Sequence, residues 1–259
     1  MRRRGGADEV GVGTTVGVAT ALDELKSRGS ALLIVGTVPE SVYVQLSARL
    51  LGDGPDRRRL IVERRRSPER RLESVDRWTP EWTRVFRCQI TARRSTAADH
   101  TDVSGGSRRT DRALETNSTT TPSLPDDEGS ESVAETVEGS VADLGTAVGD
   151  AIVWFDDVAG GLDPAELRVA FDCVGPLLSE YPRQTVFRFL HLLTHQIRAV
   201  NGTGHVRLSR PLDSDPVRVL GPLFDAVVEL RLDGTEAVHR WHFRDAAVSS
   251  EWLPVDRIA

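Results

Sequence analysis

The sequence predicts an α/β fold with a mainly parallel central sheet, a C-terminal antiparallel hairpin and a long disordered insert. Short apolar runs alternate with helical patterns along the chain, which is typical of parallel strands joined by covering helices. A turn signal, Asp233-Gly234, separates two alternating runs near the C-terminus and indicates the hairpin. Residues 94–139 are rich in Ser, Thr, Asp, Glu and Gly, and this composition indicates the insert.

The first part of the domain spans residues 19–93 and follows a Gly- and Arg-rich N-terminus, residues 1–18, that we expect to be flexible. Its clearest element is the run ALLIV at 31–35, because an unbroken apolar run is typical of a strand buried on both faces of a sheet. The other elements expected here are a short helix at 22–26, a helix at 40–51, a strand at 59–63, a short helix at 68–76 and a strand at 84–90.

Residues 94–139 are predicted to be disordered. No aromatic residue occurs between Phe86 and Trp154, and large apolar residues are scarce in the insert itself. Such a segment buries too little surface to offset an ordering entropy of about 1–2 kcal/mol per residue.

The second part of the domain spans residues 140–259, and its first segment has two interpretations. AIVWFDD can be a strand that ends in paired aspartates, Asp156 and Asp157, which would suit magnesium. Apolar residues recur every three or four positions over 141–158, however, and this pattern favours a helix. The elements expected after it are a strand at 167–171, a helix at 184–200, a strand at 204–208, a helix at 216–224 and strands at 226–232 and 238–243.

The charge balance restricts the classes of partner. The formal net charge is −6, and Lys26 is the single lysine among 33 basic residues. This usage is typical of high-GC coding or of a salt-rich cytoplasm, and it predicts a haloarchaeal source. Arginine clusters at 57–59 and 64–66 would suit phosphate contacts, an acidic partner or a solvated face. The overall acidity disfavours nucleic acid.

Membrane contact is not expected, because no apolar run approaches the roughly 20 residues of a membrane span. The basic N-terminus has no apolar signal core, so we expect a cytoplasmic protein. Two cysteines, Cys88 and Cys173, are too few for a disulfide framework or a four-ligand zinc site, and are expected to pack as small apolar residues.

The turn after the strand at 31–35 is where an α/β sheet is expected to hold a ligand. A phosphate-binding loop would place Gly-Lys-Ser/Thr at 41–43, whereas this chain has Ser41, Val42 and Tyr43 after Gly36. It therefore lacks the flexible glycine, the cation for the β- and γ-phosphates and the small hydroxyl for magnesium. Glu40 also places a carboxylate where an anion would bind. ATP hydrolysis by the usual machinery is not expected.

Five stretches carry a resemblance to a known family. They are ALLIVGTVPESVYVQLSARLL, ADLGTAVGDAI, LRVAFDCVGPLL, TVFRFLHLLTHQIRAVNGTGHVRLS and LFDAVVELR. In them the chain resembles RecA/KaiC-like ATPase domains, and more closely an uncharacterised haloarchaeal group with that fold and an eroded nucleotide site. The resemblance implies a three-layer α/β/α RecA-like sheet with Asp172 in the Walker B position. It implies that Gly36, Thr37, Ser41 and Asp172 are vestigial nucleotide-site positions, and it implies no established activity.

Histidine pairs are weaker candidates for a site. His191 and His195 lie four residues apart on one helix face, a spacing that can bind a metal, but the helix offers no evident third ligand. His239 and His242 fall on opposite faces of the hairpin strand, where packing explains them. We therefore expect no metal site and no catalytic residue.

These observations predict a RecA/KaiC-like domain without a functional Walker A motif, which serves as a non-catalytic regulatory or protein-interaction module. It would act through an unidentified protein partner or through self-association, and without a cofactor. The alternative is a residual nucleotide-binding protein or weak ATPase that uses Asp172 with ATP and magnesium. A nucleic-acid-binding protein is the third hypothesis.

Overall fold

The computed structural model describes residues 8–64, 72, 75, 79–90 and 134–256. These residues form one sheet in the order β10-β8-β7-β1-β6-β5-β2-β3-β4, with β9 paired to β8. From β7 to β4 every neighbouring pair is parallel, while β8 pairs antiparallel with β7, β9 and β10. The strands are β1 Ser30–Val35, β2 Arg58–Glu63, β3 Thr83–Ile90, β4 Ala134–Gly139, β5 Leu167–Phe171, β6 Thr203–Leu208, β7 Ala226–Asp233, β8 Glu236–Phe243, β9 Val248–Ser249 and β10 Leu253–Pro254.

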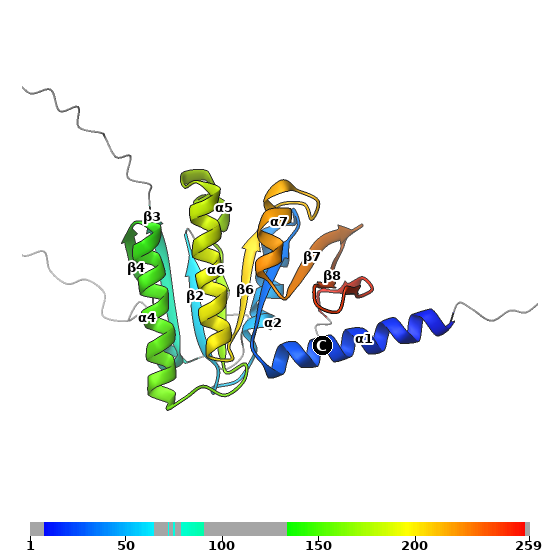
Figure 1. Cartoon of the computed structure of the whole chain (residues 1–259), viewed down its shortest axis with the longest axis horizontal. Coiled ribbons are helices and arrows are strands. Elements are labelled where there is room, and N and C mark those ends of the chain that lie inside the picture. The colour runs from blue at the N-terminus through cyan, green and yellow to red at the C-terminus, as the bar shows by residue number, and fades with distance from the viewer. Residues whose placement is uncertain (1–7, 65–71, 73–74, 76–78, 91–133, 257–259) are drawn as a thin grey trace, which may run out of the picture. The chain divides into compact units, whose positions relative to one another are not determined.

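Helices cover both faces of this sheet. Figure 1 shows α4 and α6 in front of the sheet and α2 behind it. The alternation of side chains along β1 explains how one strand serves both layers: Leu33 packs in the core under α4 and α6, and Leu32 packs in the core under α1 and α2. The helices are α1 Asp8–Ser27, α2 Glu40–Leu51, α4 Val141–Ala159, α5 Val174–Glu180, α6 Arg183–Ala199 and α7 Asp215–Leu220, with short 3-10 turns at Pro80–Trp82 and Gly221–Leu223.

The mainly parallel α/β sheet and the C-terminal hairpin are confirmed. Strand β5 and helix α2 have the predicted bounds, and the segment at 141–158 is the helix α4 rather than a strand. A capping box explains where α4 begins: the Ser140 backbone N–H donates to Asp143 Oδ2 at 2.7 Å, and the Asp143 N–H donates to Ser140 Oγ. At its other end, Asp156 Oδ1 accepts from the Leu162 N–H, so this aspartate closes a turn.

Two predicted elements differ from the structure, and a third is not tested by it. Helix α1 begins at Asp8, well before the short helix expected at 22–26. The helix expected at 216–224 ends at Leu220, and a 3-10 turn that contains Pro222 follows it. The helix expected at 68–76 lies mostly outside the described residues, although Leu72 and Val75 are buried.

The end of the predicted insert is also different, because residues 134–139 form β4 at the edge of the sheet. This strand pairs in parallel with β3, from Ala134 beside Val85 to Gly139 beside Ile90. Only Val137 is buried in it. Backbone hydrogen bonding to β3 does not require apolar side chains on a strand at the edge, so the polar composition concealed it. The remainder of the predicted insert, up to residue 133, lies outside the described residues.

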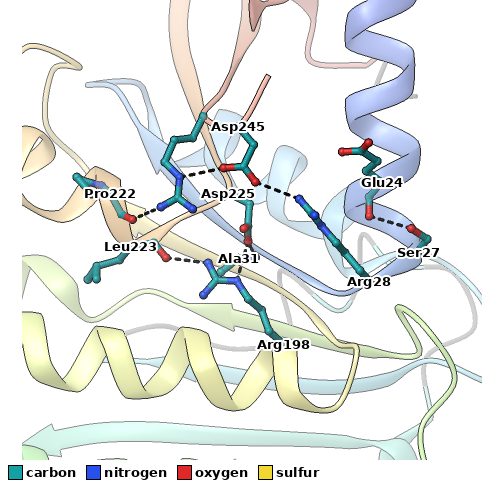
Figure 2. A network of polar contacts seen from close by, with 10 residues as sticks. Glu24, Ser27, Arg28, Ala31, Arg198, Pro222, Leu223, Asp225 and Asp245 are labelled. Carbon is teal, nitrogen blue, oxygen red and sulfur yellow. Dashed lines mark hydrogen bonds and ion pairs between the residues drawn. The ribbon is translucent and has the colours of Figure 1, made fainter. Parts of the chain in front are cut away.

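A polar network at the amino end of β1 fastens α6 to the start of β7 (Figure 2). Arg198 Nε donates to Asp225 Oδ2 at 2.9 Å, and Arg198 Nη2 donates to the Leu223 carbonyl at 2.8 Å. Asp225 Oδ2 also accepts from the Ala31 N–H at 2.8 Å. Asp225 therefore pairs with Arg198, 27 positions away, and accepts from the backbone of Ala31, 194 positions away, and neither contact leaves a local pattern in the sequence.

Candidate functional site

The carboxyl ends of β2, β5 and β6 border a pocket of about 520 Å³. We call it the carboxyl-edge pocket, and its described lining consists of Glu63, Arg64, Asp172, Gly175, Pro176, Arg207 and Ser209. Ligand sites in open α/β sheets lie at this edge, where the strand ends and their loops meet. The position is therefore the one expected for function, and Asp172 is the predicted residue that lies in it.

Arg207 lines this pocket and contacts three neighbouring side chains. Its Nη1 donates to Glu40 Oε2 at 2.7 Å and to Asp172 Oδ2 at 3.3 Å. Its guanidinium carbon lies 4.1 Å from the centre of the Tyr43 ring, a cation–π distance. The side chains of Arg207 and Asp172 are only 11% and 12% exposed.

The electrostatics of Arg207 favour its charged form. Burial by itself lowers the pKa of Arg207, but the carboxylates of Asp172 and Glu40 outweigh burial, so the pKa lies above its ordinary value. The guanidinium is thus a permanent internal counterion for two carboxylates. Removing it would leave Asp172 poorly solvated and without this partner.

This arrangement places negative charge where a phosphate-binding loop has none. Glu40 lies in the first turn of α2, where the helix dipole favours an anion. The carboxylate of Glu40 is itself that anion, and Arg207 holds it toward Asp172. Tyr43 is 1% exposed beneath the guanidinium, so it serves as packing rather than as a hydroxyl ligand on a surface.

Gly36 has a structural reason to be glycine. Its φ is +122°, and a Cβ at this position would lie 3.0 Å from the carbonyl carbon of Leu230 and closer still to the oxygen. Its N–H donates to the Arg210 carbonyl at 2.8 Å. This amide is therefore used to join the turn after β1 to the turn after β6.

The four predicted site positions do not line one common pocket among the described residues. Gly36 and Thr37 line a second pocket of about 690 Å³, together with Pro211, Leu212, Asp213 and the end of β7. Asp172 lines the carboxyl-edge pocket instead, and Ser41 is exposed and lines neither pocket. The structure thus brings Asp172 close to Glu40 through Arg207, and leaves the other three positions outside that contact.

Arg207 was not predicted as a site residue. The feature that could have indicated it is a charged residue within the apolar strand Gly-His-Val-Arg-Leu at 204–208. Glu63 was missed in the same way, because it ends the apolar run of β2 and is only 2% exposed. A charged residue at the last or next-to-last position of a buried strand could have been recognised as lying near the carboxyl edge. The residues that it contacts could not have been recognised, because they are distant in sequence.

The remaining candidates behave as packing or surface residues. Cys88 and Cys173 are both buried, and a hydrogen bond to Cys88 together with burial raises the pKa of the Cys173 thiol, which disfavours a nucleophilic thiolate. His191 and His195 are exposed on α6. Among the described residues, no group of three or more His, Cys, Asp or Glu side chains is placed to hold a metal.

Comparison with family models places this sheet in a known group. The matching model covers residues 29–230, from the start of β1 into β7, and so includes Glu40, Asp172 and Arg207. The chain belongs to DUF7504, a family of unknown function. No curated protein matches this DUF7504 chain. None of the helices in the described part of it has the length and apolar character needed to cross a membrane.

Proposed function

We propose that this DUF7504 protein is a RecA/KaiC-like domain that does not hydrolyse nucleotide and serves as a regulatory or protein-interaction module. The observation that carries the proposal is the Glu40–Arg207–Asp172 cluster. Support for the RecA-like relationship comes from the mainly parallel sheet, the turn from β1 into α2 and the position of Asp172 directly after β5.

The cluster opposes a triphosphate by charge. A phosphate at the start of α2 would lie near the Glu40 carboxylate, and two like charges about 4 Å apart repel by roughly 4 kcal/mol at a protein surface. This repulsion corresponds to at most about a thousandfold in affinity, because Arg207 already offsets part of the Glu40 charge. Relieving it would require Glu40 to leave Arg207, which would break the 2.7 Å contact. The loop also contributes no lysine to offset the cost.

The second candidate is a protein that still binds nucleotide through Asp172. The observation in its favour is the size and position of the carboxyl-edge pocket, about 520 Å³ with Arg64 and Arg207 in its lining. In that case Arg207 would exchange Asp172 for a phosphate, and the freed carboxylate would take magnesium. The two candidate functions differ in whether Arg207 leaves Asp172 when a nucleotide binds.

Calorimetric titration with ATP and magnesium in high salt tests the choice. Under the leading proposal the protein binds more weakly than about 100 µM, a free energy near −5.5 kcal/mol, and the Glu40→Gln variant binds more tightly because the repulsion is gone. Tighter binding by the unaltered protein that is lost in Asp172→Asn overturns the leading proposal. Glu138→Gln, at an exposed position on β4, is the matched control.

We further propose that the interaction includes self-association through the groove between α4 and α6. This groove has a volume of about 580 Å³ and a mostly apolar lining. Leu192 and Val153 beside it are 60% and 57% exposed. Asp150 and Arg188 also line it, so a second copy related by a twofold axis would meet it with opposite charges.

Size-exclusion chromatography with light scattering tests self-association. We expect a concentration-dependent dimer that Leu192→Asp weakens at least tenfold. Leu232→Asp, at a leucine that is 45% exposed on β7, should leave the dimer unchanged. A monomer at all concentrations, or equal effects of both variants, would refute this groove as the contact between copies. The nucleotide titration is unaffected by either result.

A further inference from the structure

Three polar side chains from β7, β8 and β9 are joined by hydrogen bonds on one face of the sheet. Ser249 Oγ lies 2.9 Å from His242 Nδ1, and His242 Nε2 lies 3.1 Å from Glu229 Oε2. His242 is opposite Ser249 in the β8–β9 ladder and opposite Val227 in the β7–β8 ladder, so Glu229 is its diagonal neighbour on the same face. The set contains a hydroxyl, an imidazole and a carboxylate in the order that nucleophilic catalysis requires.

The carboxylate determines which ring nitrogen of His242 carries the proton. An ionised carboxylate only accepts hydrogen bonds, so Glu229 Oε2 favours the neutral ring with its proton on Nε2. Nδ1 is then unprotonated and accepts from the Ser249 O–H. The nitrogen that would take the hydroxyl proton therefore already faces it. This is the division of roles in a serine–histidine–acid triad, with the two ring nitrogens exchanged.

The three side chains lie on ordered backbone and remain partly open to solvent. Next to Ser249, the buried residue Ser250 donates its N–H to the Trp241 carbonyl at 2.8 Å and accepts from the Trp241 N–H at its Oγ at 2.9 Å. The side chains of His242 and Glu229 are each 25% exposed. Glu229 also lines the pocket of about 690 Å³ at the end of β7, so there is room for a substrate beside the triad.

A cation is anchored near the hydroxyl. Arg240 lies on the same face of β8, opposite Glu229 in the β7–β8 ladder. Its Nε donates to the Ser250 carbonyl at 2.9 Å, one residue from Ser249. A guanidinium held at this place would stabilise the negative charge that develops on a carbonyl oxygen when Ser249 attacks the carbonyl carbon.

We propose that Ser249, His242 and Glu229 form a catalytic triad that hydrolyses small carboxylic esters. Ser249 Oγ bonds to the ester carbonyl carbon, its proton passes to His242 Nδ1, and the carbonyl oxygen takes up the electron pair. The bond from that carbon to the alcohol oxygen then breaks, and the alcohol leaves with the proton from His242. Water repeats both steps on the acylated serine, which releases the acid and restores the hydroxyl.

The roles of the three residues differ. Ser249 and His242 would be the catalytic residues, whereas Glu229 is a positioning residue that holds the ring and stabilises its charged form. His242 was expected only to pack, because its two partners lie on other strands. This inference goes beyond the proposed function and does not rest on it, since none of the three residues lines the carboxyl-edge pocket or the groove between α4 and α6.

Hydrolysis of p-nitrophenyl acetate, followed by release of p-nitrophenolate, tests the activity. Loss of a general base typically costs about 10²–10⁴-fold, so we expect Ser249→Ala and His242→Gln each to lower kcat by about a hundredfold or more. Ser179→Ala on α5 and His195→Gln on α6, both at exposed positions, are the matched controls and should leave the rate within about twofold. Equal rates for the unaltered protein and Ser249→Ala overturn the proposal.

The role of Glu229 is tested by the kinetic constants of Glu229→Gln. Glutamine keeps the shape of the side chain but removes the charge that fixes the ring. We expect kcat to fall at least about tenfold with KM within about twofold, because the lost interaction is with the ring and not with the ester. An unchanged kcat refutes the positioning role.

Two measurements on the unaltered protein do not depend on how the variants fold. A fluorophosphonate probe should form a P–O bond to Ser249 with loss of HF, and intact-mass and peptide mapping should place the adduct there. Nitrogen NMR, assigned with His242→Gln, should show the His242 proton on Nε2. A proton on Nδ1 refutes the triad, and so does an unreactive Ser249, which would mean that the three side chains only stabilise the sheet.

Discussion

Substitution of Gly36 by alanine separates two explanations for a glycine after the first strand. If the glycine serves backbone flexibility around a phosphate, alanine should change binding and cost little stability. The structure predicts a large loss of stability instead. The φ of +122° is disfavoured for any residue with a Cβ, and costs about 1–2 kcal/mol.

Steric overlap adds to this cost. The new Cβ would lie 3.0 Å from the carbonyl carbon of Leu230, whereas carbon atoms prefer about 3.5–4.0 Å, so β7 must move by half an ångström or more. Overpacking of this kind costs about 1–3 kcal/mol. The total expected for Gly36→Ala is therefore about 2–5 kcal/mol, with further loss if the bond from the Gly36 N–H to Arg210 breaks.

Urea denaturation followed by circular dichroism measures this difference. Gly54→Ala is the matched control, because Gly54 has a φ of +110° and its Cβ would meet nothing within 4 Å. It should lose only the conformational part, about 1–2 kcal/mol. If the two variants lose the same stability, the close approach of β7 is not what requires glycine at position 36, and the structural explanation is wrong.

Other variants probe the pH dependence, the capping box and the core. The pKa of His239 is lowered in the folded state, so the unfolded chain takes up its proton first and stability should fall as pH drops below about 6.5. His239→Gln should flatten that fall in denaturation midpoints between neutral and acid pH, while His195→Gln should not. Ser140→Ala removes the acceptor for the Asp143 N–H and should cost about 0.5–2 kcal/mol in urea denaturation. Phe155→Ala, at a fully buried ring on the inner face of α4, should cost about 3–5 kcal/mol in the same assay, and a cost below 1 kcal/mol would contradict its core position.

Local patterns were sufficient for most of the sheet. The run at 31–35 and the strand at 167–171 were recognisable because a strand buried on both faces must be apolar throughout. The helix α4 was recognisable by its three- and four-residue spacing despite AIVWFDD, since periodicity is a property of neighbours in sequence. Strand β4 was not recognisable, because it is held at the edge of the sheet by backbone hydrogen bonds to β3 rather than by an apolar side-chain pattern.

For the candidate site, the sequence predicted the missing phosphate-binding residues and the position of Asp172, but not the contacts that Asp172 makes. The absence of lysine from the turn after β1 can be read directly, and Asp172 was placed at a strand end. The partner of Asp172 could not be named, because Arg207 lies 35 positions away from it and 167 positions from Glu40. Neither separation leaves a local pattern.

The amino-acid sequence alone determined the alternation of strands and helices, the C-terminal hairpin and the absence of Gly-Lys-Ser/Thr at 41–43, since each depends on residues adjacent in the chain. Only the tertiary structure decided that Arg207 bridges Glu40 and Asp172. The physical reason is the parallel sheet: its strand order brings the ends of β1, β5 and β6 together although long helical connections separate them in sequence.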